Sequence, residues 1–130
     1  MTTANKSEAY LKGEALFKQL HGQHSGEQIV RELQDICPDH VNQTYEWAFN
    51  GILARPGLDI LTREYLIIAS CVTLGYATPQ LKAHIEAAIN AGGTKEQIVE
   101  VILQMLFYAG GAATSNALRT AKEVFNNNSH

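Results

Sequence analysis

Helix start and stop signals divide this 130-residue chain into segments with helical spacing of apolar residues, and strand-like alternation is scarce. Gly22 ends the first segment and Pro38 breaks the chain after the second. Thr94 with Gln97 three residues later forms a capping-box pattern that begins the sixth segment. The pattern predicts an all-α fold of about six to seven helices. Their approximate ranges are 7–22, 25–37, 39–54, 59 or 62 to 75, 78–92, 94–109 and 112–125.

The length and composition favour one globular domain that covers residues 1–130, with N-terminal helices at about 7–37. A chain of 130 residues can bury a core without disulfides or metals. Hydrophobic residues make up 45% and charged residues 18%, which is typical of globular proteins. The formal charge of −3 and the absence of a basic cluster give no electrostatic basis for nucleic-acid binding.

Two of the predicted helices are apolar around most of their circumference. Residues 65–74 contain only two small polar breaks, and residues 98–108 contain Glu100 and Gln104. Such helices must be covered on several sides, and in a small protein a second subunit provides that cover, so we expect a homo-oligomer. Both runs are shorter than the ~20 residues that cross a bilayer, and the N-terminus lacks the apolar core of a signal peptide. We therefore expect a cytoplasmic protein without a membrane segment.

His84 and Glu64 are the first candidates for chemistry. His84 lies beside the apolar stripe of its predicted helix, where it either packs at the edge of the core or acts as a general acid or base. Glu64 lies in the first turn of the preceding helix, where it is either a surface carboxylate favoured by the helix dipole or part of a site.

The two cysteines, Cys37 and Cys71, are expected to be free thiols. Cys71 follows Glu64 by seven residues and so shares its helix face, yet a lone helical cysteine is usually a small core residue. The chain has no CxxC motif, no His-Glu-x-x-His motif and no His/Cys cluster at zinc spacing, so no metal is expected.

Further candidates lie near two of the helix ends. Glu46, Trp47 and Arg55 precede or begin the Arg-Pro-Gly turn, where Arg55 could pair with a substrate carboxylate or with a neighbouring acidic residue. Tyr108, ahead of Gly110-Gly111, could line a pocket or simply pack. The glycine pair is not a phosphate loop, because no strand precedes it and no Lys-Ser/Thr follows.

The chain resembles the carboxymuconolactone decarboxylase family over about residues 44–125. The resemblance is carried by ARPGLDILTREYLIIASCVTLGY and by QLKAHIEAAINAGGTKEQIVEVILQMLFYAGGAATSNALRTAKEVF. It implies an alkylhydroperoxidase-like, all-helical subunit that assembles into a trimer or a hexamer.

The family has two functional branches, and the cysteines distinguish them. The peroxidase-like branch carries a Glu, a CxxC motif and a His, of which Glu64 and His84 match the first and last. The cysteine positions would lie near Tyr76, Ala77 and Gln80, where no cysteine is present. A dithiol peroxidase needs an attacking thiol and a resolving thiol side by side.

The resemblance therefore favours the decarboxylase-like branch, which uses no thiol and no cofactor. It implies His84 as proton donor or acceptor, with Glu64 or Glu46 orienting it, on a small carboxylated lactone or related acid. Arg55, Trp47, Tyr108 and Cys71 are the candidates for substrate contact. Two alternatives remain open: a thiol-dependent peroxide reductase, and a non-catalytic binding or scaffold oligomer of the same fold.

Overall fold

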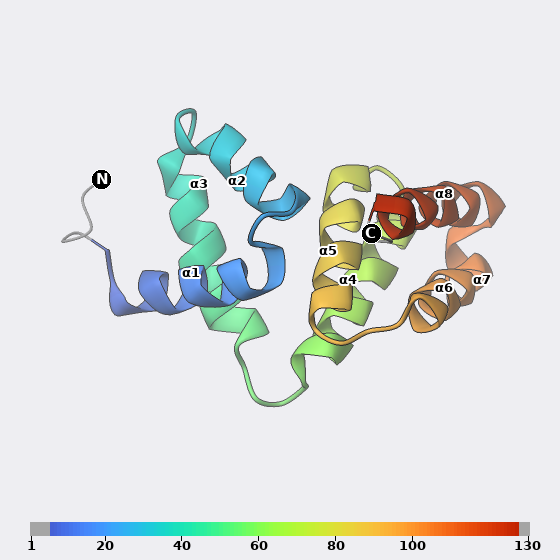
Figure 1. Cartoon of the computed structure of the whole chain (residues 1–130), viewed down its shortest axis with the longest axis horizontal. Coiled ribbons are helices and arrows are strands. Elements are labelled where there is room, and N and C mark those ends of the chain that lie inside the picture. The colour runs from blue at the N-terminus through green and yellow to red at the C-terminus, as the bar shows by residue number, and fades with distance from the viewer. Residues whose placement is uncertain (1–5, 128–130) are drawn as a thin grey trace. The chain divides into compact units, whose positions relative to one another are not determined.

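The structure, a computed structural model, describes residues 6–127, and these residues form helices and no β-strand (Figure 1). The all-α prediction is therefore confirmed for the described part of the chain. The helices gather into two compact units, Met1–Ile60 and Leu61–His130, which are described separately below. The organisation of the chain as one domain remains a prediction.

All seven predicted helices are present, and two of them consist of two consecutive elements. The third predicted helix is a short α-helix that continues into a π-helix, and the sixth is broken at Met105. None of the described helices is long and apolar enough to cross a membrane. The first unit contains α1 (Glu8–His21), α2 (Ser25–Gln34), α3 (Pro38–Gln43) and the π-helix η2 (Thr44–Leu53). Next come α4 (Ile60–Leu74), α5 (Thr78–Asn90), α6 (Lys95–Gln104), α7 (Leu106–Ala109) and α8 (Gly111–Asn127).

In the first unit, α1 lies across η2 at a very close approach (Figure 1). A Cβ atom on Gly13 would overlap the carbonyl oxygen of Tyr45, so only glycine fits at this crossing. Around it, aromatic rings pack edge to face, with centroid distances of 4.9 Å for Tyr10–Tyr45 and 5.1 Å for Phe17–Phe49. The core of this unit is therefore an aromatic cluster between α1 and η2.

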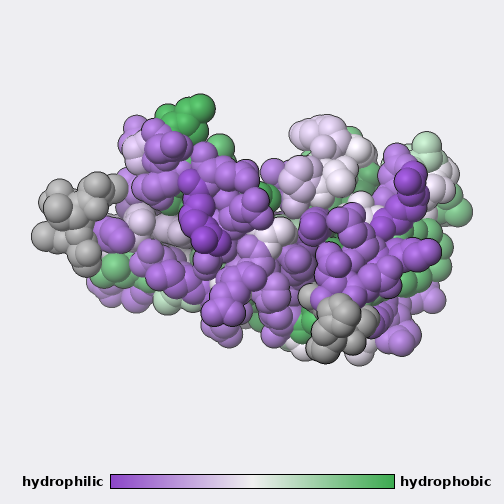
Figure 2. Space-filling model, turned by 45° about the horizontal axis from the view of Figure 1, so that its top comes forward, coloured by the Kyte–Doolittle hydropathy of each residue, from purple (hydrophilic) through white to green (hydrophobic). Residues whose placement is uncertain are grey.

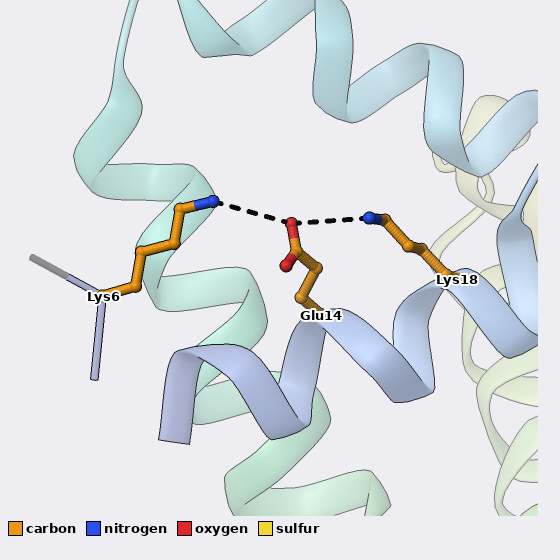
Figure 3. Close-up of polar contacts among 3 residues, drawn as sticks. All are labelled: Lys6, Glu14 and Lys18. Atoms are coloured by element: carbon orange, nitrogen blue, oxygen red, sulfur yellow. Dashed lines mark ion pairs between the residues drawn. The ribbon is translucent and has the colours of Figure 1, made fainter. Parts of the chain in front are cut away.

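In the same unit, two lysine side chains flank Glu14 of α1 (Figure 3). Glu14 Oε2 lies 4.0 Å from Lys6 Nζ and 3.9 Å from Lys18 Nζ, and Lys6 Nζ also lies 4.9 Å from the centroid of the Tyr10 ring. Solvent-accessible ion pairs of this kind each contribute at most about 1 kcal/mol. The aromatic cluster, rather than these pairs, therefore holds α1 in place.

The second unit has an aliphatic core shared by α4, α5, α6 and α8. The helix start and stop signals predicted from the sequence are present in this unit. Thr94 and Gln97 make the reciprocal capping box, Pro79 lies in the first turn of α5, and Gly92 adopts a φ of +100° just after that helix. The Tyr65 hydroxyl donates a 2.7 Å hydrogen bond to Gln97 Oε1, which ties α4 to the start of α6. The largest fully buried aliphatic side chains of this core are Ile68, Ile85, Ile98, Ile102, Val72 and Val124.

Candidate active site

A buried carboxylate and a histidine meet between α4 and α5 in the second unit. Glu64 Oε1 lies 2.7 Å from His84 Nδ1, a distance typical of a charge-assisted hydrogen bond. The Glu64 side chain is 0% exposed, whereas 17% of the His84 side chain reaches the surface. The inner end of the pair is therefore sealed, and its outer end is accessible.

The helix spacing explains why Glu64 is buried. Along α4 the buried residues are Glu64, Ile68, Cys71 and Val72, at positions four, seven and eight after the glutamate. These positions form one stripe of a helix, so the stripe that enters the core carries Glu64 with it. The alternative that Glu64 is a surface carboxylate is therefore wrong. The opposing His84 lies beside the buried stripe of α5, as its sequence position indicates.

The bond fixes the orientation of the imidazole ring. When the Glu64 carboxylate is ionised it can only accept hydrogen bonds, and Nδ1–H of His84 is then the donor. Nε2 is then the nitrogen through which the ring can exchange a proton with another group. Such an arrangement of histidine and carboxylate is suited to general acid–base chemistry.

The second oxygen of Glu64 is unusual. Oε2 is buried and has no hydrogen-bond partner among the described residues. Leaving a buried polar atom unsatisfied costs about 1–3 kcal/mol, more for a charged group. A fold that retains this cost at a carboxylate–histidine pair marks a candidate functional site.

Cys71 lies seven residues after Glu64 on the buried face of α4, within the apolar core. Cys71 is only 7% exposed, and neither Cys71 nor the exposed Cys37 forms a disulfide. Burial, followed by the nearby charge of Glu64, raises the pKa of the Cys71 thiol above its usual value. The adjoining cavity measures about 10 Å³, room for about one water molecule. The interpretation of Cys71 as a core residue is therefore confirmed.

The remaining candidates of the first unit lie on its surface. Glu46 Oε1 accepts a 3.0 Å hydrogen bond from the hydroxyl of Ser7, the N-cap residue of α1. Of the two glutamates that the sequence offers as partners of His84, Glu64 is therefore the one hydrogen-bonded to it. Trp47 is 68% exposed and Arg55 is also exposed.

In the second unit, Tyr108 is highly exposed and Glu86 is buried. Tyr108, on α7, is 85% exposed, and its ring centroid lies 5.1 Å from that of Phe107. Glu86, two residues after His84, is only 7% exposed, and no sequence motif marks it. The sequence signal for its burial is that apolar residues flank it on a helix buried on several sides. Within residues 6–127, no group of three or more His, Cys, Asp or Glu side chains could hold a metal ion.

The comparisons with known proteins agree with this architecture. The sequence profile of the carboxymuconolactone decarboxylase family matches residues 38–123, which include both members of the Glu64–His84 pair. A 4-carboxymuconolactone decarboxylase of Acinetobacter baylyi is 31% identical over 121 residues, which cover 93% of this chain and 90% of that protein.

Two further relatives share shorter stretches. An uncharacterized 15.0 kDa protein of Paracoccus denitrificans is 34% identical over 74% of this chain and 72% of its own length. A nitrosuccinic acid decarboxylase of Metarhizium robertsii is 31% identical over 62% of this chain and 56% of its own length. With the family profile matching most of the chain, and with an all-helical structure, this protein belongs to the carboxymuconolactone decarboxylase family.

Proposed function

We propose that this protein is a decarboxylase that acts on a small carboxylated lactone or a related small acid, without a cofactor. The observation that carries the proposal is the 2.7 Å hydrogen bond between His84 Nδ1 and the buried Glu64 carboxylate. The names of two relatives support it, because both are decarboxylases of small acids. 4-Carboxymuconolactone is the first substrate to test.

The proposed reaction needs one proton and no redox step. The bond between the lactone ring and its carboxylate breaks, CO₂ leaves, and the electron pair is delocalised over the unsaturated lactone. A proton is then added at carbon, which gives the enol lactone. The enzyme must stabilise the developing negative charge and supply this proton.

His84 is the proposed proton donor. Its Nε2 delivers the proton to carbon and regains one from water, while Glu64 holds the ring through Nδ1 and stabilises the positive charge of the protonated ring. Arg55 is a weaker proposal as the partner of a substrate carboxylate, because a guanidinium can bind a carboxylate through two hydrogen bonds. Trp47 and Tyr108 remain candidates for contact with the substrate, whereas Cys71 is a buried core residue.

The peroxide reductase alternative has less support. The chain lacks the CxxC motif, and the raised pKa of the Cys71 thiol disfavours the thiolate that such chemistry requires. A Cys71→Ser variant separates the two functions. Under our proposal it decarboxylates normally, whereas a thiol peroxidase would lose peroxide turnover.

The direct test is CO₂ release by the purified protein from 4-carboxymuconolactone, with nitrosuccinic acid as a second substrate. Replacing His84 with alanine should lower kcat by about 10²- to 10⁴-fold, which is the usual contribution of general acid–base catalysis. His40→Ala is the matched control, because His40 is an exposed histidine on α3. The proposal fails if neither substrate releases CO₂ above background, and the assigned mechanism fails if His84→Ala retains full activity.

A further inference from the structure

The link between α5 and α6, residues 91–94, approaches α4 very closely at Gly93. A Cβ atom on Gly93 would lie 2.6 Å from the Tyr65 hydroxyl oxygen and 3.0 Å from Leu61 Cδ1, both on α4. It would also lie 2.9 Å from the carbonyl oxygen of Ala88 on α5. Gly93 is not among the glycines with a positive φ, so the close approach, and not the backbone conformation, requires a glycine here.

At the same place a side chain of α4 enters the capping box of α6. Gln97 Oε1 accepts the Tyr65 hydroxyl at 2.7 Å and the backbone N–H of Thr94 at 3.4 Å. Gln97 N donates in turn to Thr94 Oγ1 at 3.1 Å. A capping box needs only its two capping residues, so the tyrosine adds a bond between helices to a local motif. We call Tyr65, Gly93 and Gln97 the tyrosine clamp.

The Tyr65 side chain is suited to hold this bond. Figure 2 shows hydrophilic side chains over much of the face that it draws, where hydrogen bonds between side chains compete with water. The Tyr65 ring is instead half-buried and packs against the aliphatic core. Burial raises the pKa of its hydroxyl, and a hydrogen bond from the Thr94 backbone lowers it in part. The hydroxyl therefore remains a protonated donor at neutral pH.

The tyrosine clamp lies beside the Glu64–His84 pair on both helices. Tyr65 follows Glu64 directly on α4. On α5, Ala88 lies one turn after His84, and its carbonyl oxygen accepts the N–H of Gly93 at 2.8 Å. At this end, α4 and α5 are therefore joined through the link as well as through the core.

We propose that Tyr65 is a positioning residue for the candidate active site. Its bond to Gln97 holds α4 at the spacing from α5 at which Glu64 Oε1 lies 2.7 Å from His84 Nδ1. Hydrogen bonds weaken as the donor–acceptor distance and angle depart from their preferred values, so a shift of α4 weakens the pair. The kinetic consequence rests on the proposed function, whereas the geometry of the pair can be tested without a substrate.

NMR of the protein with isotope-labelled histidine tests the geometry. The Nδ1 proton of His84 should give a downfield resonance in the wild type, because its hydrogen bond is short and its acceptor is a buried carboxylate. His84→Gln assigns this resonance by removing it. Tyr65→Phe and Gln97→Ala each break the bond of the tyrosine clamp, so each should move the resonance upfield or abolish it through faster exchange with water.

The kinetic consequence is tested by CO₂ release from 4-carboxymuconolactone. Tyr65→Phe and Gln97→Ala should each lower kcat by about 10- to 100-fold, because a misplacement of about 1 Å can cost about 100-fold in rate. KM should change less than about threefold, since the loss acts on the chemical step. Gln97→Glu, whose carboxylate still accepts from Tyr65, should restore the wild-type kcat. An unchanged kcat in both of the first two variants overturns the role in the reaction.

Two controls separate positioning from stability. Thr73→Val removes a hydroxyl that donates to the carbonyl oxygen of Ala69 in the same helix, and it should keep the wild-type kcat and resonance. Thr94→Val removes the cap of α6 but keeps the bond between Tyr65 and Gln97. It should lower the thermal unfolding midpoint and leave the His84 resonance in place.

The two measurements distinguish the possible outcomes. The proposal is overturned if neither Tyr65→Phe nor Gln97→Ala alters the His84 resonance, or if Thr94→Val alters it as much as they do. If the resonance responds as expected but the wild type releases no CO₂ from either substrate, the positioning of the pair is supported and only the proposed function fails.

Discussion

Replacing Glu64 with glutamine isolates the charge of the buried carboxylate. The amide keeps the size of the side chain. Its carbonyl oxygen can still accept a hydrogen bond from His84 Nδ1, which lies 2.7 Å from Glu64 Oε1 in the wild type. What is lost is the negative charge that stabilises the protonated imidazole ring. Because Glu64 is fully buried, this change alters no surface that a substrate could touch.

The expected loss can be estimated from two limits. Exchanging a charge-assisted hydrogen bond for a neutral one loses about 1–2 kcal/mol. Two unit charges about 4 Å apart attract by about 4 kcal/mol at an effective dielectric constant of ~20, which sets the upper limit. Since each 1.4 kcal/mol is a factor of ten in rate, kcat should fall roughly 5- to 1000-fold. KM should change less than about threefold, because the loss acts on the charged ring and not on ground-state binding.

The assay is CO₂ release from 4-carboxymuconolactone, with kcat and KM measured separately. Glu100→Gln, at an exposed position of α6, is the matched control and should behave like the wild type. Thermal unfolding should show Glu64→Gln to be no less stable than the wild type, because an amide is less costly to bury than a carboxylate with an unpartnered oxygen. An unchanged kcat, or a change confined to KM, would refute the role assigned to the carboxylate.

Three further predictions concern the packing and the titrating groups. Gly13→Ala should destabilise the first unit by about 3 kcal/mol or more in denaturant unfolding, whereas Gly111→Ala, where a Cβ meets nothing within 4 Å, should not. Burial, then neighbouring negative charges, raises the pKa of Tyr45 from 10.0 to about 12, so its neutral form stabilises the fold fully below pH 10. That contribution, roughly 1–2 kcal/mol after allowance for nearby water, should be lost between about pH 10 and pH 12, and Tyr45→Phe should lack this loss. Iodoacetamide should label the exposed Cys37 and spare the buried Cys71 at pH 8, as mass spectrometry can test; equal labelling would contradict the pKa shift.

Local sequence signals predicted the helices because helix ends depend on nearby residues. The capping box of Thr94 and Gln97 satisfies backbone N–H groups within one turn, and Gly92 takes a left-handed conformation that other residues avoid. The π-helix at residues 44–53 has no such signal. This π-helix contacts α1 where Gly13 meets Tyr45, 32 residues later in the chain. The contact exists only once α1 lies across η2.

In the candidate site, too, some features follow from the local sequence and others depend on contacts between distant residues. Sequence position and family resemblance single out Glu64 and His84, but spacing alone leaves Glu64 equally compatible with a surface carboxylate at the start of a helix. Its burial depends on which face of α4 packs against α5 and α8, and that is set by the whole core. The hydrogen bond that Glu46 accepts from Ser7 could not be predicted locally either, because it joins residues 39 positions apart.

The order of residues is enough to predict the all-helical class, the positions of most helix ends and the residue types available for acid–base chemistry, because each follows from interactions within a few residues. The packing of the helices is needed to know that Glu64 is buried against His84, that Cys71 is a core thiol, and that α4 keeps an uncharged face exposed. These properties arise from contacts between helices, where burial, charge and hydrogen bonding depend on residues distant in the chain.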